Sequence, residues 1–288
     1  MVVAALSERP VLDRAASDQA LRELVWDALG QVQDPELDEP ITDLGFVRSL
    51  EVIESTEVVG DGGVGAQGAA VVVHLRLPTS FCSPNFAYLM ASDSKDALRG
   101  LAGIWSVVVE LDDHHDSDLI NAGLAADAGY KGTFRHEAEN DLEELRTTFR
   151  RKAHTAAMER CLTALLRAEP GRTVESLVEV TLAGLPSWRT TDALLRRRVA
   201  LGLPVEAGSQ VMVDHTGSGC APADAALLLR RARSTRVSID GNAHFCRGLL
   251  ATRYPGAEAD QTARPEGAEP AFVPLTSLLL PRAKEHQP

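Results

Sequence analysis

The spacing of apolar residues changes partway along this chain of 288 residues. In residues 69–77, His74 and Arg76 alternate with apolar residues, which is typical of a strand with one buried face. In residues 137–167 the apolar positions recur every three or four residues, as on the buried face of a helix. The two patterns predict an α+β domain followed by a mostly α-helical domain, and the length fits two cores better than one.

The first domain is predicted to occupy residues 17–125, after an N-terminal tail at residues 1–16. Ser17 or Asp18 is expected to cap its first helix, and Ser83 followed by Pro84 marks the start of its second. A glycine-rich loop separates the first two strands. The order helix, strand, strand, helix, strand is expected at residues 17–31, 46–53, 69–77, 83–100 and 104–111, and it predicts helices packed on one sheet.

The second domain is predicted at residues 134–254. Its helices are expected at residues 137–167, 174–183, 191–201, 222–233 and 244–251. Residues 255–288 are rich in Pro, Gly, Ala and Glu and predict a flexible, disordered tail. The apolar segment 271–280 within this tail is expected either to dock on a partner or to fold back on its own domain.

The composition excludes several classes of function. A formal charge of -12 and an aromatic fraction of 5% argue against binding to nucleic acid or anionic lipid. No apolar run is long enough to span a membrane, and the N-terminus lacks the pattern of a signal peptide, so a cytoplasmic protein is expected. The four cysteines are scattered along the chain, which predicts free thiols or ligands and not a disulfide scaffold.

Three spaced elements of the first domain carry chemistry. They are the turn Asp34-Pro35-Glu36, the strand opening Asp43-Leu44-Gly45-Phe46-Val47, and Cys82 just before a predicted helix. A thiol at a helix N-terminus faces unpaired N–H groups and the positive end of the helix dipole, both of which favour the thiolate that binds iron or a cluster. The alternative is a buried cysteine that packs as a small hydrophobe beside Phe81 and Phe86.

The acidic residues near these elements have structural alternatives as well. Asp34 can shape its own turn and Asp43 can cap its own loop, whereas Glu36 is the freest of the three to act. Carboxylates beside a soft thiolate ligand could hold a ferrous ion briefly. Acids next to a thiolate also repel it and raise its pKa unless a metal or a basic group intervenes.

The three elements, in this order, resemble the DUF59 family of MIP18-like and PaaD-like iron-sulfur cluster assembly factors. The resemblance covers residues up to about 125. The third element departs from the family pattern Thr-x-Pro-x-Cys-Pro, because both prolines are displaced. It reads Pro78-Thr79-Ser80-Phe81-Cys82-Ser83.

The resemblance implies an accessory maturation factor that is not an enzyme. It would hold iron or an iron-sulfur cluster transiently and assist its insertion into a client metalloenzyme. The resemblance to PaaD-like members implies that this client is a multicomponent oxygenase. The implied partners are this client and iron-sulfur assembly proteins, and a homodimer stays open. The residues implied to handle metal or cluster are Cys82, Glu36, Asp43 and Asp34.

Two other functions stay open for the same domain. In a thiol enzyme, Cys82 would be the nucleophile and His74, His114 or His115 its base, although no nucleophile motif supports this. In an adaptor, the domain would hold a partner by its surface without any metal. The run from His114 to Asp116 is otherwise expected to be a solvated polar turn.

The second domain holds a separate constellation of possible ligands. His215, Cys220, His244 and Cys246 would satisfy the tetrahedral preference of zinc, but their spacing matches no zinc motif. The segment from Gly217 to Cys220 is alternatively an anion-binding turn, although it lacks the lysine and the full glycine pattern of a phosphate-binding loop.

Overall fold

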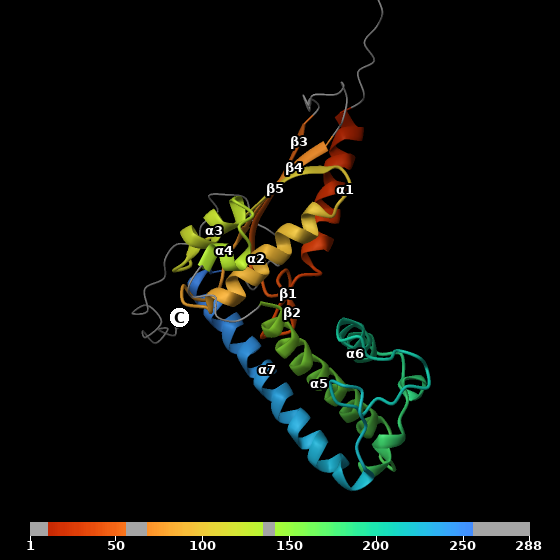
Figure 1. The fold of residues 1–288 in the computed structure, drawn as a ribbon. Helices are drawn as coiled ribbons and strands as arrows, with labels where there is room; N and C mark the ends of the chain where they lie inside the picture. Colours follow the sequence, from red (N-terminus) through yellow and green to blue (C-terminus); the bar gives the residue numbers. More distant parts are fainter. Residues whose placement is uncertain (1–10, 56–67, 135–141, 256–288) are drawn as a thin grey trace, which may run out of the picture. The chain divides into compact units, whose positions relative to one another are not determined.

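The computed structural model describes residues 11–55, 68–134 and 142–255, without the side chains of residues 11–18, 54 and 55. Figure 1 shows the elements in chain order. The described residues form two compact units. The first, here the α+β unit, contains residues 11–34, 39–134 and 246–255, and the second, the helical unit, contains residues 35–38 and 142–245.

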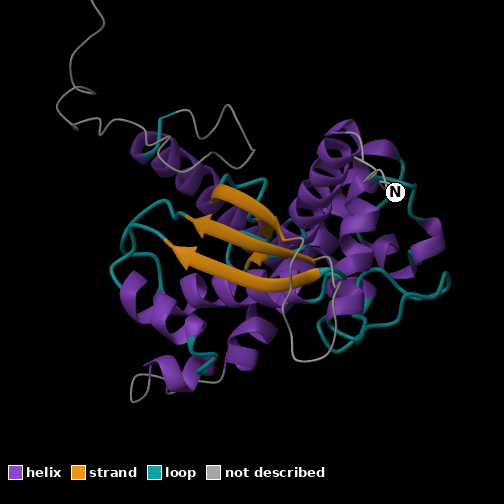
Figure 2. Cartoon of the chain, turned by 90° about the horizontal axis from the view of Figure 1, so that it is seen from above, coloured by secondary structure: helices purple, strands orange, loops and turns teal. Residues whose placement is uncertain are grey.

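The α+β unit is built on a three-stranded sheet. Strand β3 pairs antiparallel with β4, and β4 pairs parallel with β5, so that β4 lies in the centre. The parallel pair is joined by the crossover helix α2. Figure 2 shows the three strands side by side. The elements are α1 (Val11–Leu29), β1 (Gln33–Asp34), β2 (Glu39–Pro40), β3 (Val47–Ser55), β4 (Gly68–Leu75), α2 (Pro84–Arg99), β5 (Ile104–Leu111), α3 (Ser117–Ala125) and α4 (Gly129–Phe134).

The burial pattern of β4 explains why this segment forms the central strand. Every second residue from Ala69 to Leu75 is buried, and the residues between are half-buried. Helices α1 and α2 pack against the sheet. Helix α2 begins at Pro84 after Ser83 and ends before Gly100, as predicted. The loop that carries Cys82 is therefore held between a buried strand and a well-defined helix start.

The α+β unit differs from its prediction at its first helix and after its last strand. Helix α1 begins at Val11, inside the segment predicted as a tail, so neither Ser17 nor Asp18 caps it. Helices α3 and α4 follow β5 where no helix was predicted. Their short connection contains Asp127 at a φ of 48°, and Lys95 and Arg99 of α2 bind its carboxylate. The connection is stabilised by residues of α2 that are distant in the sequence, and therefore no local sequence pattern predicts it.

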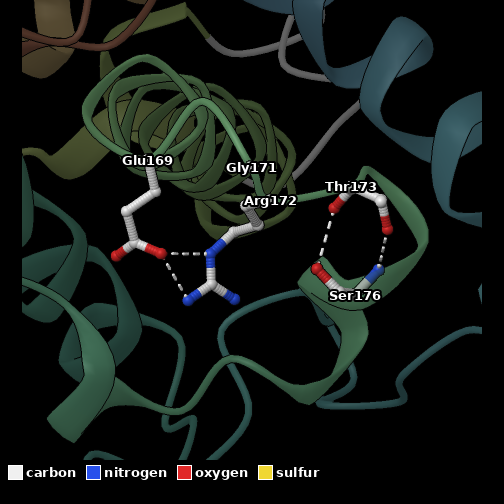
Figure 3. A pocket seen from close by; sticks show the side chains of 5 residues that line it. All are labelled: Glu169, Gly171, Arg172, Thr173 and Ser176. Carbon is white, nitrogen blue, oxygen red and sulfur yellow. Dashed lines mark hydrogen bonds and ion pairs between the residues drawn. The ribbon is translucent and has the colours of Figure 1, made fainter.

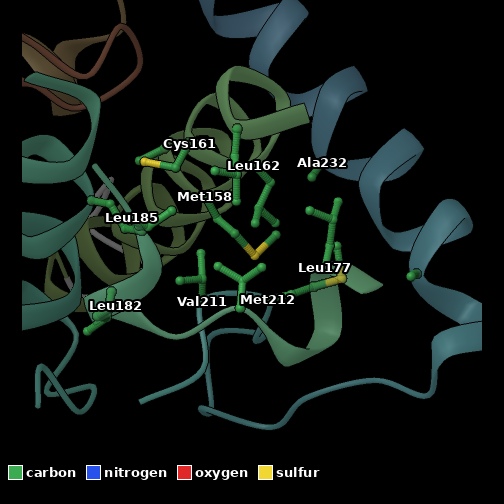
Figure 4. Close-up of a cluster of buried hydrophobic side chains, with 14 residues drawn as sticks. Met158, Cys161, Leu162, Leu177, Leu182, Leu185, Val211, Met212 and Ala232 are labelled. Carbon is green, nitrogen blue, oxygen red and sulfur yellow. The ribbon is translucent and has the colours of Figure 1, made fainter. Parts of the chain in front are cut away.

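The helical unit packs around one apolar cluster, which Figure 4 shows in close-up. Met158, Cys161 and Leu162 of α5 meet Leu177, Val211 and Met212 from the connecting segments, and all six side chains are buried. The unit consists of α5 (Leu142–Ala168), the 3₁₀ turns η2 (Glu175–Glu179) and η3 (Leu182–Gly184), α6 (Arg189–Ala200), η4 (Pro222–Asp224) and α7 (Ala225–Arg253), whose last eight residues group with the α+β unit.

The fold class is confirmed, but two helix predictions for this unit were wrong. The segment predicted as a helix at residues 174–183 forms η2 and η3, because Val180 is extended and the adjacent Thr181 makes a β-bridge with Gln210. The two helices predicted at residues 222–233 and 244–251 are one continuous helix, α7. Residues 256–288 and the apolar segment 271–280 lie outside the described residues. No described helix combines the length and the apolar character needed to cross a membrane.

Candidate functional site

Cys82 lies in the loop that joins β4 to α2. It precedes Ser83, the N-cap residue of α2, and its side chain is half-buried. The hydroxyl of Thr79 lies 3.5 Å from Cys82 Sγ, at hydrogen-bonding distance for sulfur. The neighbouring Phe81 is 82% exposed. Cys82 is therefore partly exposed. Of the two aromatic residues expected beside a buried cysteine, Phe81 is exposed and Phe86 is half-buried.

His114 anchors the backbone of Cys82. Its Nδ1 lies 3.1 Å from the backbone N–H of Asp116 and accepts that hydrogen bond, so the proton is on Nε2, which donates to the carbonyl oxygen of Cys82 at 2.9 Å. The side chain is buried. The prediction of a solvated turn is wrong for His114, although His115 is exposed.

A second hydrogen bond joins the β4–α2 loop, which carries Cys82, to the β5–α3 loop, which carries His114. The backbone N–H of His115 donates to the carbonyl oxygen of Ser80 at 2.9 Å, and the rings of His115 and Phe81 lie 5.9 Å apart. Residues 79–83 and 113–116 therefore form one hydrogen-bonded surface around the thiol. Phe81 and His115 are exposed on this surface, and Cys82, which lies between Phe81 and Ser83 along the chain, is half-buried.

The predicted acidic residues have separate surroundings. Asp34 is buried on β1, and Asp43 accepts a 3.4 Å hydrogen bond from the Thr42 hydroxyl. Glu36 groups with the helical unit and accepts a hydrogen bond from Asn242 at 3.1 Å, so it is not the free acid that was predicted. Within residues 11–55, 68–134 and 142–255, no three His, Cys, Asp or Glu side chains are grouped so that they could hold a metal ion. The structure therefore does not assemble Cys82, Glu36, Asp43 and Asp34 into a three-ligand site.

The second predicted constellation is dispersed too. His215 and His244 are exposed, and Cys220 and Cys246 are half-buried. Cys220 donates to the sulfur of Met212 at 3.7 Å, and burial together with Asp224 raises the pKa of its thiol. Cys246 groups with the α+β unit and the other three with the helical unit.

The turn that precedes Cys220 is closed by a carboxylate of this chain. Asp214 Oδ1 accepts hydrogen bonds from the backbone N–H groups of Thr216, at 2.8 Å, and Ser218, at 3.1 Å. These hydrogen bonds, with that of the Thr216 hydroxyl, lower the pKa of Asp214. The N–H groups that an anion would need are therefore already occupied at these two positions.

A surface pocket of the helical unit contains none of the predicted site residues. It is lined by Glu169, Gly171, Arg172, Thr173 and Ser176, as Figure 3 shows. Arg172 pairs with Glu169 at 2.8 Å, and Ser176 bonds with Thr173 to form a short turn. The polar groups of this pocket pair with one another, and Cys82 is not among the residues that line it.

Comparisons with known proteins bear on the α+β unit. No curated protein and no solved structure was found to match the chain. One family model, described as iron-sulfur cluster assembly protein, matches residues 22–111. The matched segment contains Asp34, Asp43 and Cys82 and ends before α3, whereas α5, α6 and α7 lie beyond it. Residues 22–111 thus form a domain of the iron-sulfur cluster assembly family, as the resemblance predicted.

Proposed function

We propose that this chain is an accessory maturation factor that assists the insertion of iron or an iron-sulfur cluster into a client metalloenzyme. The observation that carries the proposal is the half-buried thiol of Cys82, presented inside the segment that matches the iron-sulfur cluster assembly family. A multicomponent oxygenase is the client class that the PaaD-like resemblance favours. Iron or a cluster is the cargo in this proposal and not a resident cofactor.

Cys82 would act as one ligand during transfer. Thiolate is a soft donor that suits iron and iron-sulfur clusters, and a single contact lets the cargo leave again. The remaining ligands would come from the donor protein or from the client. The hydroxyl of Thr79, 3.5 Å from the sulfur, can donate to the thiolate when the cargo is absent.

A non-catalytic role agrees with the histidines around this loop. Both ring nitrogens of His114 are engaged by backbone groups, and Nδ1 of His74 lies 3.0 Å from Asp112. A general base for Cys82 needs a free nitrogen within hydrogen-bonding reach of the sulfur. Among the described residues, the side-chain contact of Cys82 Sγ is with the Thr79 hydroxyl and not with an imidazole nitrogen, which favours ligand chemistry over nucleophilic catalysis.

The exposure of Phe81 favours a second version, in which the domain binds its client as an adaptor without any metal. A large apolar side chain that is 82% exposed beside Cys82 is suited to a protein contact. The net charge of -12 would favour a client with a basic face in either version. If Cys82→Ser activates the client as well as the unchanged chain does, the adaptor version is supported.

Anaerobic reconstitution tests the role of the thiol. The full chain would be incubated with ferrous iron and sulfide under reducing conditions, and cluster formation and retention followed by visible absorbance. Cys82→Ala is expected to lose the charge-transfer absorbance, because the thiolate ligand is gone. Cys220→Ala is the matched control, since Cys220 is also half-buried but lies in the helical unit. Identical spectra for Cys82→Ala and the unchanged chain would remove Cys82 as a ligand.

A further inference from the structure

The C-terminal end of α7 is bonded to the loop that carries Cys82. Arg253 donates from Nη1 to the carbonyl oxygen of Leu77 at 3.1 Å and from Nη2 to the hydroxyl of Ser80 at 2.9 Å. The same Nη2 donates to the carbonyl oxygen of Asp113 at 2.5 Å. One guanidinium thus joins the β4–α2 loop to the β5–α3 loop, which are the two loops that surround the thiol.

Tyr254 strengthens the same junction. Its hydroxyl donates to Asp113 Oδ2 at 2.9 Å, and the side chain is buried. Burial, together with Asp113, raises the pKa of Tyr254, so the phenol stays protonated and remains a donor. The guanidinium carbons of Arg76 and Arg253 lie 5.1 and 5.2 Å from the centre of its ring.

Arg76 extends this junction to a third loop. It is buried, and its Nε donates to the carbonyl oxygen of Gly45 at 3.0 Å. Gly45 belongs to the Asp43 strand opening and has a φ of 74°, a conformation that glycine adopts without strain. Arg76, Tyr254 and Arg253 therefore connect two of the elements that carry the family resemblance.

These contacts come from outside the family segment. The match ends at residue 111, whereas Arg253 lies 140 residues after Asp113 and 176 residues after Leu77. Arginine presents several donors in a fixed planar fork, which lets one side chain hold acceptors from two loops at once. This chain thus adds to the family domain a fastening that the segment 22–111 does not contain.

We propose that Arg253 and Tyr254 are positioning residues for Cys82, and that the end of α7 sets how far its thiol can be reached. The role of this positioning in cargo transfer rests on the proposed function, whereas the effect of Arg253 and Tyr254 on the position of Cys82 does not. The loop keeps two bonds of its own when Arg253 is removed, namely His114 to the Cys82 carbonyl and His115 N–H to the Ser80 carbonyl. Loss of Arg253 should therefore loosen a loop that stays attached.

The rate of thiol alkylation in the full chain tests this proposal. Each cysteine would be followed separately by mass spectrometry of its peptide during reaction with iodoacetamide. Arg253→Ala is expected to raise the rate at Cys82 by about tenfold, because three hydrogen bonds no longer oppose opening of the loop. The rate at Cys220, in the helical unit, should stay unchanged. Arg253→Lys should give an intermediate rate, because an ammonium can hold only part of the same acceptor set.

Two further variants separate positioning from general effects. Tyr254→Phe removes only the bond to Asp113 and should raise the Cys82 rate by a smaller factor than Arg253→Ala. Arg247→Ala is the charge-matched control, because Arg247 lies on the same helix and pairs with Glu39 instead of the loop. An unchanged Cys82 rate in Arg253→Ala overturns the proposal. If that variant does not fold, an unchanged rate in Arg253→Lys overturns it.

The outcome is distinguishable from a failure of the proposed function. If Cys82→Ala leaves the reconstitution spectra unchanged, the ligand role fails, but the alkylation rates still report the position of the loop. If the Cys82 rates do not respond to Arg253, the positioning role fails, and the reconstitution result stands by itself.

Discussion

The imidazole of His114 donates from Nε2 to the carbonyl oxygen of Cys82, 2.9 Å away, while its Nδ1 accepts from the N–H of Asp116. One buried side chain thereby connects the β5–α3 loop to the residue that carries the thiol. Arg253 makes a comparable connection farther back in the β4–α2 loop. The loop is thus fastened on both sides of Phe81, and Phe81 itself projects into solvent.

Removal of the imidazole should therefore destabilise the α+β unit. His114→Ala leaves the Cys82 carbonyl and the Asp116 N–H without their partner, and the expected loss is about 1 to 3 kcal/mol. Urea unfolding followed by the fluorescence of Trp26 and Trp105, in a Trp188→Phe background, measures this loss. His114→Gln should recover part of it, because an amide N–H can reach toward the same carbonyl. An unchanged urea midpoint for His114→Ala would mean that the imidazole does not anchor the loop.

Local signals predicted the parts of the fold that depend on neighbouring residues. The alternation of β4 is sufficient to place a half-buried strand, and Ser83 before Pro84 marks the start of α2. The match at residues 22–111 confirms the family resemblance that three short motifs indicated. Cys82 was found in the same way, because a thiol just before a helix is visible in the sequence.

The parts that sequence reasoning missed depend on distant residues. Arg253 and Tyr254 lie just after the helix predicted at residues 244–251, and no neighbouring residue indicates that Ser80 and Asp113 are their partners. His114 and His115 are adjacent and chemically identical, yet one is buried and the other exposed. His114 is the buried one because the fold places the Cys82 carbonyl and the Asp116 N–H within hydrogen-bonding reach of its ring.

The buried ion pair of the helical unit gives a second stability prediction. Arg197 Nη2 lies 2.7 Å from Asp38 Oδ2, and only 17% and 9% of the two side chains are exposed. Burial raises the pKa of Asp38 although Arg197 opposes that shift. Arg197→Ala should therefore cost about 3 kcal/mol, because it leaves a carboxylate buried without its cation.

The double variant checks whether the loss comes from the stranded charge. Arg197→Ala combined with Asp38→Asn should be less destabilised than Arg197→Ala alone, because asparagine has no charge and tolerates the φ of 56° at this position. Urea unfolding followed by Trp188, in a background without Trp26 and Trp105, isolates the helical unit. If the double variant is less stable than Arg197→Ala, the lost stability does not arise from an unpaired carboxylate.

Close packing between α3 and α4 gives a third prediction. A Cβ atom at Gly123 would lie 2.0 Å from the hydroxyl oxygen of Thr133, and that hydroxyl donates to the Gly129 carbonyl at 2.8 Å. Gly123→Ala should therefore push the two helices apart and cost about 1 to 3 kcal/mol.

Two variants accompany the Gly123→Ala measurement. Thr133→Ala in the same chain should recover part of the loss, because it removes the two nearest atoms. Gly241→Ala is the control, since a Cβ there meets nothing within 4 Å inside α7, and it should gain about 0.5 to 1 kcal/mol. Thermal unfolding followed by calorimetry gives the comparison. Equal stability of Gly123→Ala and the unchanged chain would show that the helices have room for a methyl group.

A buried histidine gives the helical unit a specific response to acid. His154 on α5 is fully buried, and neither ring nitrogen has a hydrogen-bond partner among the residues that the structure describes. Burial, with the charges of Arg198 and His215, lowers its pKa to about 4 against the opposing effect of Asp214. The imidazole is therefore neutral in the folded chain at pH values where an exposed histidine takes up a proton.

The sign of the pH dependence follows from the difference between the pKa of His154 in the folded chain and its ordinary value. Above the ordinary pKa of 6.5 the histidine is neutral in both states and adds no pH dependence. As the pH falls toward about 4, the unfolded chain binds a proton that the folded chain does not bind, so stability decreases, by about 3 kcal/mol over the whole interval. Urea midpoints reported by Trp188 across this interval should fall steeply for the unchanged chain and less steeply for His154→Leu. His215→Ala, which changes an exposed histidine, should keep most of the steep fall, and equal slopes for the unchanged chain and His154→Leu would exclude His154 as its source.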